Sequence, residues 1–135
     1  GTVIGMSDSS NAIYVPDGID FETMRALKED RKERIKEYAN LKSCVTVFDS
    51  CKDIWSIKCD VALPCATQFE LDEEDAKKLI SNGVVGVFEG ANMPCTLEAS
   101  NLFIKNKVLY SPGKASNAGG VATSGLEIIQ NINKR

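Results

Sequence analysis

The feature that most constrains the fold of this chain is a regular alternation of short apolar runs with amphipathic segments. Apolar runs of strand length occupy residues 2–7, 44–48, 59–65, 84–90 and 108–112. Helical patterns occupy residues 21–41, 71–83, 97–106 and 124–135. The run CDVALPC, at 59–65, is apolar almost throughout, as strands covered on both faces require. The alternation therefore predicts an α/β fold with an open, mostly parallel sheet.

The composition excludes several classes of function. The 135 residues carry a formal net charge of −3 without an evident basic face, which argues against nucleic acid as a partner. No apolar run is long enough to span a bilayer. The chain has no histidine, so it cannot build a Ser-His-Asp or Cys-His catalytic centre. We predict no metal site, and we interpret the five cysteines as scattered thiols: Cys44, Cys51, Cys59, Cys65 and Cys95.

Small and polar residues follow four of the predicted strands at the point where each strand ends. The four segments are SDSS, PCATQ, EGANMPC and SPGKASNAGG. In open α/β sheets, ligands bind beyond the carboxyl ends of the strands. The last segment continues into SNAGGVATSG, at 116–125, which joins an apolar run to an apolar helix, whereas a linker would have polar neighbours. We therefore expect all four segments to line a ligand site.

Glycine-rich motifs that bind phosphate are absent from the sequence. There is no G-x-G-x-x-G turn of the dinucleotide-binding type, and Gly113-Lys114-Ala115 lacks the hydroxyl of a Walker loop. The first residue is Gly1 rather than methionine, next to a strand-like run, so we expect the chain to be a piece of a longer protein. Asp8 would then end the second strand of a dinucleotide-binding domain, where an acid usually binds the adenosine ribose.

Four motifs together carry a family resemblance. S-D-S, P-C-A-T-Q, E-G-A-N-M-P-C-T and N-A-G-G-V-A-T-S-G-L-E, in this order and spacing, resemble the hexameric NAD(P)-dependent glutamate dehydrogenases. The resemblance extends from Val3 to Asn131. It implies that residues 1–135 are part of an NAD(P)-binding domain and that the substrate domain is absent from the chain. The implied fold is a Rossmann-like, doubly wound, mostly parallel sheet without its first strand and glycine-rich turn.

The resemblance also implies a reaction, the reversible oxidative deamination of L-glutamate to 2-oxoglutarate and ammonium with NADP(H). The lysines and the aspartate that transfer protons in this family belong to the substrate domain. No catalytic residue is therefore expected in this chain, which should be inactive alone. The implied partners are these small-molecule substrates and, for the whole enzyme, further copies in a homohexamer. A cytoplasmic location is expected, with an organelle left open.

By similarity, Ser7, Asp8 and Ser9 lie beside the adenosine ribose of the coenzyme. An acid alone would favour NAD, because it accepts from both ribose hydroxyls and repels a 2′-phosphate. Serine hydroxyls can instead donate to phosphate oxygens, and Arg31 and Arg34 occupy positions that are basic in NADP-preferring members. Ordinary solvated helix charge is the alternative for either arginine. Together these residues favour NADP, with NAD possible.

The nicotinamide half of the coenzyme is assigned by similarity to two other segments. Ala66 and Thr67 would pass under the ribose and pyrophosphate, unless they only form a strand-to-helix turn. Asn92 and Asn117 resemble the asparagines that hold the nicotinamide ribose and carboxamide, since an amide both donates and accepts. The alternative is that each asparagine serves a turn with left-handed backbone.

The glycine-rich stretch resembles an element of substrate specificity. Gly119 and Gly120 would let the backbone approach the nicotinamide and the substrate closely. Val121 would line the pocket for the substrate side chain, and Ser124 would donate a hydrogen bond to the side-chain carboxylate of glutamate. The competing interpretation of Ser124 is a plain helix N-cap.

Two further functions remain open from the sequence. The chain could be a stand-alone, non-catalytic module that binds a nucleotide or a partner, or it could belong to a different amino-acid dehydrogenase. The stretch NAGGVATSG argues against the second. Coding sequence upstream with G-x-G-x-x-G would favour the glutamate enzyme, whereas a start codon just before Gly1 would favour the module.

Replacing Ser124 separates its two possible roles. In the complete enzyme, Ser124→Ala should raise the KM for glutamate roughly tenfold, because a hydrogen bond to a carboxylate is lost, and should change the KM for coenzyme less. Steady-state kinetics with each substrate varied in turn measure both constants. Small and equal changes in the two constants would support the helix cap instead.

Overall fold

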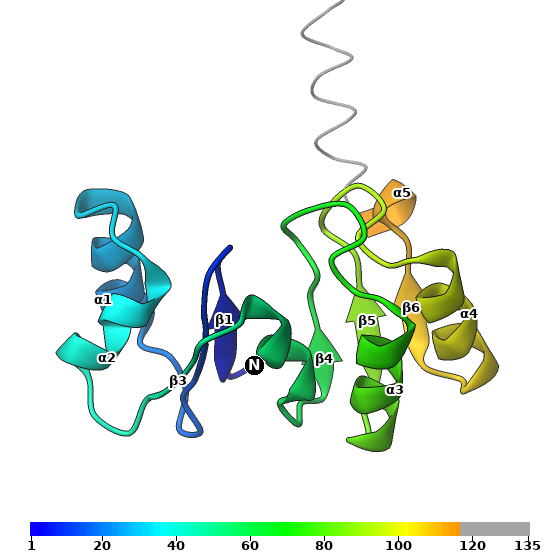
Figure 1. Cartoon of the computed structure of the whole chain (residues 1–135), viewed down its shortest axis with the longest axis horizontal. Coiled ribbons are helices and arrows are strands. Elements are labelled where there is room, and N and C mark those ends of the chain that lie inside the picture. Colours follow the sequence, from blue (N-terminus) through cyan, green and yellow to red (C-terminus); the bar gives the residue numbers. More distant parts are fainter. Residues whose placement is uncertain (117–135) are drawn as a thin grey trace, which may run out of the picture.

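The computed structural model describes residues 1–116, and Figure 1 shows the arrangement of their elements. The strands are β1 (Gly5–Ser7), β2 (Ala12–Tyr14), β3 (Thr46–Phe48), β4 (Val61–Ala62), β5 (Gly86–Phe88) and β6 (Leu109–Ser111). The α-helices are α1 (Phe21–Arg25), α2 (Tyr38–Leu41), α3 (Glu73–Ser81), α4 (Leu97–Lys105) and α5 (Gly113–Ser116). A π-helix, η1 (Ala26–Asp30), and two 3-10 helices, η2 (Ile35–Glu37) and η3 (Cys51–Ser56), complete the described elements. The predicted helix at 124–135 lies outside the described residues.

The described strands form two three-stranded sheets. β4, β5 and β6 pair in parallel with β5 at the centre, and this parallel sheet within a mixed α/β architecture confirms the predicted fold class. β1, β2 and β3 instead pair antiparallel, with Ile13 opposite both Met6 and Val47. Sequence analysis missed β2, because its apolar residues run directly into the turn-forming sequence Pro16-Asp17-Gly18.

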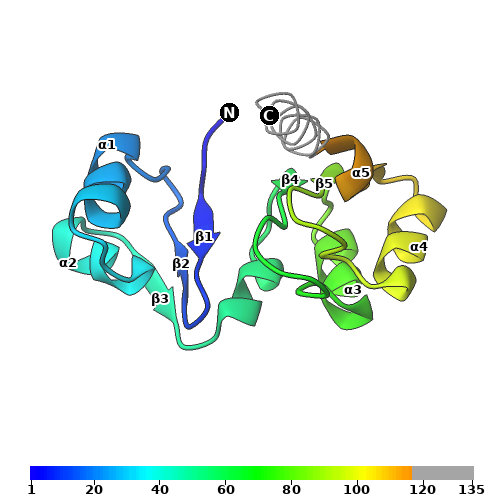
Figure 2. The same cartoon turned by 90° about the horizontal axis from the view of Figure 1, so that it is seen from above.

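The two sheets lie in different halves of the molecule, and η3 lies between them (Figures 1 and 2). Helix η3 contacts α3 on one side and β1 and β2 on the other. Its Trp55 is buried in the core of the parallel half. A side chain at Gly5 of β1 would meet Ile54 Cδ1 at 3.0 Å, so the glycine allows the close approach of β1 to η3.

Helices α3 and α4 contact each other and bury one apolar face each. Ala76 and Leu79 on α3, and Ala99 and Phe103 on α4, are spaced three and four residues apart and are at most 1% exposed. The phenyl ring of Phe103 stacks on Tyr110 of β6, with ring centroids 6.1 Å apart. The core that these residues share contains Trp55, Ala62, Leu71, Ala76, Leu79, Val84, Val87, Cys95, Ala99 and Phe103.

Helix α3 lies within the predicted helical segment 71–83 and is two residues shorter at each end. Asp72 is the N-cap, and it forms a capping box with Asp75, each carboxylate accepting the other residue's backbone N–H. Lys52 of η3 donates to Asp75 Oδ2 at 2.5 Å, so the N-terminus of α3 is also tied to η3. Gly83, just past the helix, has φ of 81°, the left-handed conformation that glycine adopts most readily.

The single helix predicted over residues 21–41 is wrong. The segment is helical to Asp30, breaks, and begins again at Ile35. At the break, Arg31 N–H donates five residues back to the Ala26 carbonyl, and Lys32 has a positive φ of 52°. The backbone N–H of Ile35 then donates to Asp8 Oδ2 at 3.0 Å. A side chain 27 residues away therefore caps the second part, which helical periodicity cannot reveal.

Removing the Phe103 ring should destabilise the parallel half strongly. Phe103 is fully buried, so Phe103→Ala should lower the free energy of unfolding by about 3–5 kcal/mol through lost burial and a cavity. Phe21→Ala, at a residue that is 71% exposed, is the matched control and should change it by less than about 0.5 kcal/mol. Urea unfolding followed by Trp55 fluorescence measures both, and equal effects would contradict the assigned core.

Candidate functional site

The turn after β1 is organised by the carboxylate of Asp8. Its Oδ1 accepts the backbone N–H groups of Ser10 at 2.9 Å and Asn11 at 3.0 Å, and its Oδ2 accepts that of Ile35. These bonds fix the turn between β1 and β2 and join it to the start of η2. A carboxylate has about four lone-pair sites, so little capacity is left for a ribose hydroxyl.

Arg34 lies against the same turn. One guanidinium nitrogen donates to both Ser9 Oγ and Ser10 Oγ at 2.8 Å, and Nε lies 3.9 Å from Asp8 Oδ2. The arginine side chain is nevertheless 54% exposed. The structure thus brings together three of the predicted residues, Asp8, Ser9 and Arg34, and adds Ser10, which sequence analysis missed. We call these four residues the Arg34 cluster.

The other two residues predicted for this end of the site make no such contact in the described part of the chain. Ser7 ends β1 and is exposed. Arg31 is exposed and pairs with Glu33, with 3.0 Å between Arg31 Nη2 and Glu33 Oε1. Their predicted roles remain predictions.

The electrostatics of Asp8 match its hydrogen bonding. Burial favours the neutral acid, but the backbone N–H groups of Ile35, Asn11 and Ser10 outweigh it and lower the pKa of Asp8 to about 2. The positive charge of Arg34 acts in the same direction. Asp8 is therefore a carboxylate at neutral pH, and its negative charge lies beside the guanidinium of the half-exposed Arg34.

The loops that follow β4 and β5 lie side by side at the carboxyl end of the parallel sheet (Figure 1). The loop after β4 donates from Phe69 N–H to the Met93 carbonyl and from Leu71 N–H to the Pro94 carbonyl, both at 3.0 Å. Gly90 N–H donates back to the Pro64 carbonyl at 3.0 Å. Main-chain hydrogen bonds therefore hold the segments PCATQ and EGANMPC together, as expected for neighbouring strand ends.

The predicted coenzyme residues of these loops are accessible. Ala66, Thr67 and Asn92 are all exposed, and Ala66 N–H donates to Glu70 Oε1 at 3.1 Å. Phe69 and Met93 have positive φ values of 56° and 49°, which bulky side chains rarely adopt. Such strained backbone persists only where the surrounding structure determines it, and it clusters at ligand sites.

Glu89, at the end of β5, is the main residue that sequence analysis missed. Its side chain is buried, with 3% exposure, and it accepts two backbone N–H groups. Cys95 donates to Oε2 at 3.1 Å and Gly113 to Oε1 at 2.8 Å. The signal in the sequence is a single acid at the end of the apolar run VVGVFEG.

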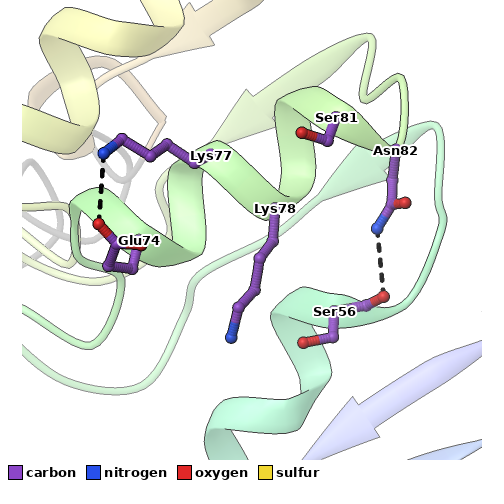
Figure 3. Close-up of a pocket in the computed structure, with 6 residues that line it drawn as sticks. All are labelled: Ser56, Glu74, Lys77, Lys78, Ser81 and Asn82. Atoms are coloured by element: carbon purple, nitrogen blue, oxygen red, sulfur yellow. Dashed lines mark hydrogen bonds and ion pairs between the residues drawn. The ribbon is translucent and has the colours of Figure 1, made fainter.

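A surface hollow beside α3 lies away from these groups (Figure 3). It is lined by Ser56, Glu74, Lys77, Lys78, Ser81 and Asn82. Lys77 pairs with Glu74 at 3.3 Å, and Asn82 Nδ2 donates to the Ser56 carbonyl at 3.2 Å. None of the predicted site residues that the structure describes lines this hollow.

Three predicted residues, Asn117, Val121 and Ser124, lie outside the described residues. Within residues 1–116, no group of three or more cysteine and acidic side chains is arranged to hold a metal ion. None of the described helices has the length and hydropathy needed to cross a membrane.

Comparison with known proteins finds a family match over the whole chain. A sequence model of the family described as Glutamate/Leucine/Phenylalanine/Valine dehydrogenase matches residues 1–135. The chain belongs to this dehydrogenase family. The family resemblance that the four motifs indicate is thereby confirmed.

Several relatives are named as glutamate dehydrogenases. Over 93% of this chain, the identity to the NAD(P)-specific glutamate dehydrogenase of Xylanibacter ruminicola is 54%. Over 96% of this chain, the identity to the NADP-specific glutamate dehydrogenase of Escherichia coli is 50%. The chain is 48% identical to the NAD-specific glutamate dehydrogenase of Bacteroides fragilis, also over 96%. The crystal structure of Plasmodium falciparum glutamate dehydrogenase superimposes with a TM-score of 0.84 at 46% identity, over 98% of this chain. This chain spans only 28–29% of the length of these relatives.

The Asp8 carboxylate should make the stability of this dehydrogenase chain depend on acid pH. Its pKa in the folded chain, about 2, lies below the ordinary 3.8, so its contribution is present above pH 3.8 and is lost as the pH falls towards 2. Asp8→Asn should cost about 1–2 kcal/mol of unfolding free energy at pH 7 and less at pH 2.5. Asp17→Asn, on an exposed turn, is the control and should follow the wild type at both pH values.

Urea unfolding at pH 7, 4 and 2.5 measures the effect. A stability difference between Asp8→Asn and wild type that stays constant over this range would contradict the role assigned to Asp8.

Proposed function

We propose that this chain is part of the NADP-binding domain of a glutamate dehydrogenase. The reaction is the reversible oxidative deamination of L-glutamate to 2-oxoglutarate and ammonium. The relatives named above support it, since three that differ in coenzyme name share the glutamate activity at 48–54% identity. Because the chain spans less than a third of these relatives, the activity is proposed for the complete polypeptide.

The Arg34 cluster is the observation that carries the choice of coenzyme. A guanidinium and two serine hydroxyls on an exposed turn at the end of β1 suit the 2′-phosphate of NADP, since all three groups can donate to phosphate oxygens. Asp8 would act there by orienting Arg34 and the turn, since most of its acceptor capacity is already used. Arg31, from the same connection, would add positive charge.

NAD remains possible as an alternative coenzyme. The names of relatives at nearly equal identity include both NADP-specific and NAD-specific enzymes, so overall similarity does not separate the two. Ser7 beside the ribose would serve either coenzyme. Local chemistry at the end of β1 therefore supports NADP, and kinetics must test it.

At the other end of the coenzyme, the paired loops would receive the nicotinamide half. Bound nicotinamide would supply the hydride acceptor, and this chain would supply its position. Ala66 and Thr67 would lie along the ribose and pyrophosphate, and Asn92 and Asn117 would hold the nicotinamide ribose and carboxamide. The two asparagines would do so through amides that both donate and accept.

The glutamate side chain would be bound by Val121 and Ser124. We assign no catalytic residue to this chain. The proposed complete enzyme is a homohexamer located in the cytoplasm. A stand-alone binding module would bind coenzyme without turning over glutamate, so an activity assay of the complete polypeptide separates the two functions.

Replacing Arg34 tests the choice of coenzyme. In the complete enzyme, Arg34→Ala should raise the KM for NADPH roughly tenfold or more, because a charge-assisted contact to the 2′-phosphate is lost. The KM for NADH, which has no such phosphate, should change less than about twofold. Arg31→Ala is the matched control and should have a smaller effect, since Arg31 pairs with Glu33.

Initial rates of 2-oxoglutarate amination, with each coenzyme varied in turn, give the two KM values for the wild type and for each variant. Unchanged KM values for both coenzymes in Arg34→Ala would refute NADP recognition by the Arg34 cluster.

A further inference from the structure

We infer that Glu89 is a positioning residue for the nicotinamide half of the coenzyme, holding the loop of Asn92 and the segment that leads to Asn117 in one fixed arrangement. This inference rests on the proposed function, because it concerns the same coenzyme site. It assigns a role to a buried acid that, within residues 1–116, forms no hydrogen bond to a predicted ligand residue and bonds instead to Cys95 and Gly113.

Glu89 closes the loop in which Asn92 lies. It is the first residue after β5, and its own N–H donates to the Ser111 carbonyl of β6 at 2.9 Å. Its Oε2 accepts the N–H of Cys95, six residues further along the chain. Both ends of the loop 89–95 are thus joined by one side chain, with Asn92 exposed between them.

The second carboxylate oxygen reaches the next strand's loop. Oε1 accepts the N–H of Gly113, the first residue of α5, at 2.8 Å. Three residues separate α5's first residue from Asn117 in the sequence. The Glu89 carboxylate therefore joins the loop after β5 to the loop after β6. Moving either loop relative to the other would break the hydrogen bond between Glu89 and Gly113.

The loop after β4 packs against the same point. A side chain at Gly90 would meet Cys65 Sγ at 2.6 Å and would have to displace Cys65, so the glycine next to Glu89 allows the two loops to touch. Glu89 is consequently at the junction of all three loops that follow the parallel strands.

A carboxylate is needed here for reasons of hydrogen bonding rather than of ion pairing. Within residues 1–116, Glu89 takes part in none of the ion pairs. Its partners are the backbone N–H groups of Cys95 and Gly113, the Tyr110 hydroxyl and the Cys95 thiol. Burial, followed by hydrogen bonding to Glu89, raises the pKa of the Tyr110 phenol, so this hydroxyl remains a donor. A carboxylate accepts at both oxygens, whereas a glutamine would direct its amide N–H groups at one of the backbone N–H donors.

The experiment compares two ligands that occupy different parts of the coenzyme site. NADPH extends to the nicotinamide end, whereas adenosine 2′,5′-bisphosphate occupies only the region of the Arg34 cluster. In the complete enzyme, Glu89→Gln should weaken NADPH binding roughly tenfold, because the nicotinamide contacts are misplaced, and should leave adenosine 2′,5′-bisphosphate binding within about twofold of wild type. Calorimetric titration of each ligand gives the dissociation constants.

A destabilising control in the same core shows whether Glu89 acts only through folding. Val84→Ala removes a buried side chain just before β5, at the opposite end of the strand from Glu89. It should lower the melting temperature and leave the ratio of the two dissociation constants unchanged. Loss of both ligands in parallel in Glu89→Gln, or loss of neither, would overturn the positioning role.

A measurement on the wild type keeps the inference testable if Glu89→Gln fails to fold. NADPH should slow the amide hydrogen exchange of Cys95 and Gly113 together, while adenosine 2′,5′-bisphosphate should change neither. Protection of one amide without the other would overturn the shared role of Glu89. If the wild type binds neither ligand, the proposed coenzyme function itself is refuted, and that result is distinct from an unchanged Glu89→Gln.

Discussion

Backbone N–H groups in turns and at the starts of helices have no partner within a sheet or helix and need other acceptors, and this constraint shapes both halves of the molecule. In each half, a carboxylate just past a strand supplies them. Asp8 follows β1 and accepts from Ile35, and Glu89 follows β5 and accepts from Gly113, across 27 and 24 residues respectively. The loops proposed to hold the coenzyme are therefore ordered by side-chain acceptors, outside the regular pairing of the strands. This arrangement puts adaptable polar residues on a rigid frame, as binding sites require.

The two halves correspond to the two ends of the proposed ligand. The antiparallel half presents the Arg34 cluster, a cation with two hydroxyls, which suits a phosphate. The parallel half presents exposed small and amide residues on loops joined by main-chain hydrogen bonds, which suits a flat ring with a carboxamide. η3 connects these halves, since Lys52 pairs with Asp75 of α3, Trp55 enters the parallel core and Ile54 packs on Gly5. The spacing between the two ends of the site thus depends on the packing of one short helix.

Overall sequence identity does not decide whether the coenzyme is NADP or NAD. Relatives named for NADP and for NAD are 50% and 48% identical to this chain, and both match over 96% of it. Overall identity therefore does not separate the two coenzymes, and our proposal rests on a few side chains at the end of β1. Here the pair proposed to favour NADP comes from segments far apart in sequence, since 25 residues separate Arg34 from Ser9. Arginine at this position alone could be ordinary surface charge, and its contact with two serine hydroxyls supports a phosphate site.

Local signals in the sequence were sufficient for the parallel half: apolar runs for β4, β5 and β6, caps and a glycine for α3, and apolar spacing for α4. They also led to the family and to the accessible residues Ala66, Thr67 and Asn92. Tertiary structure alone decided the pairing of β2, the break after Asp30, the two-sided role of Glu89 and the separation of Arg34 from Arg31. The physical reason is common to these features. Each involves a contact with residues distant in the chain, such as β3 for β2, Asp8 for Ile35, Ser9 for Arg34 and Gly113 for Glu89. Such a contact leaves no periodic pattern in the sequence, whereas burial of one face of a helix or strand does.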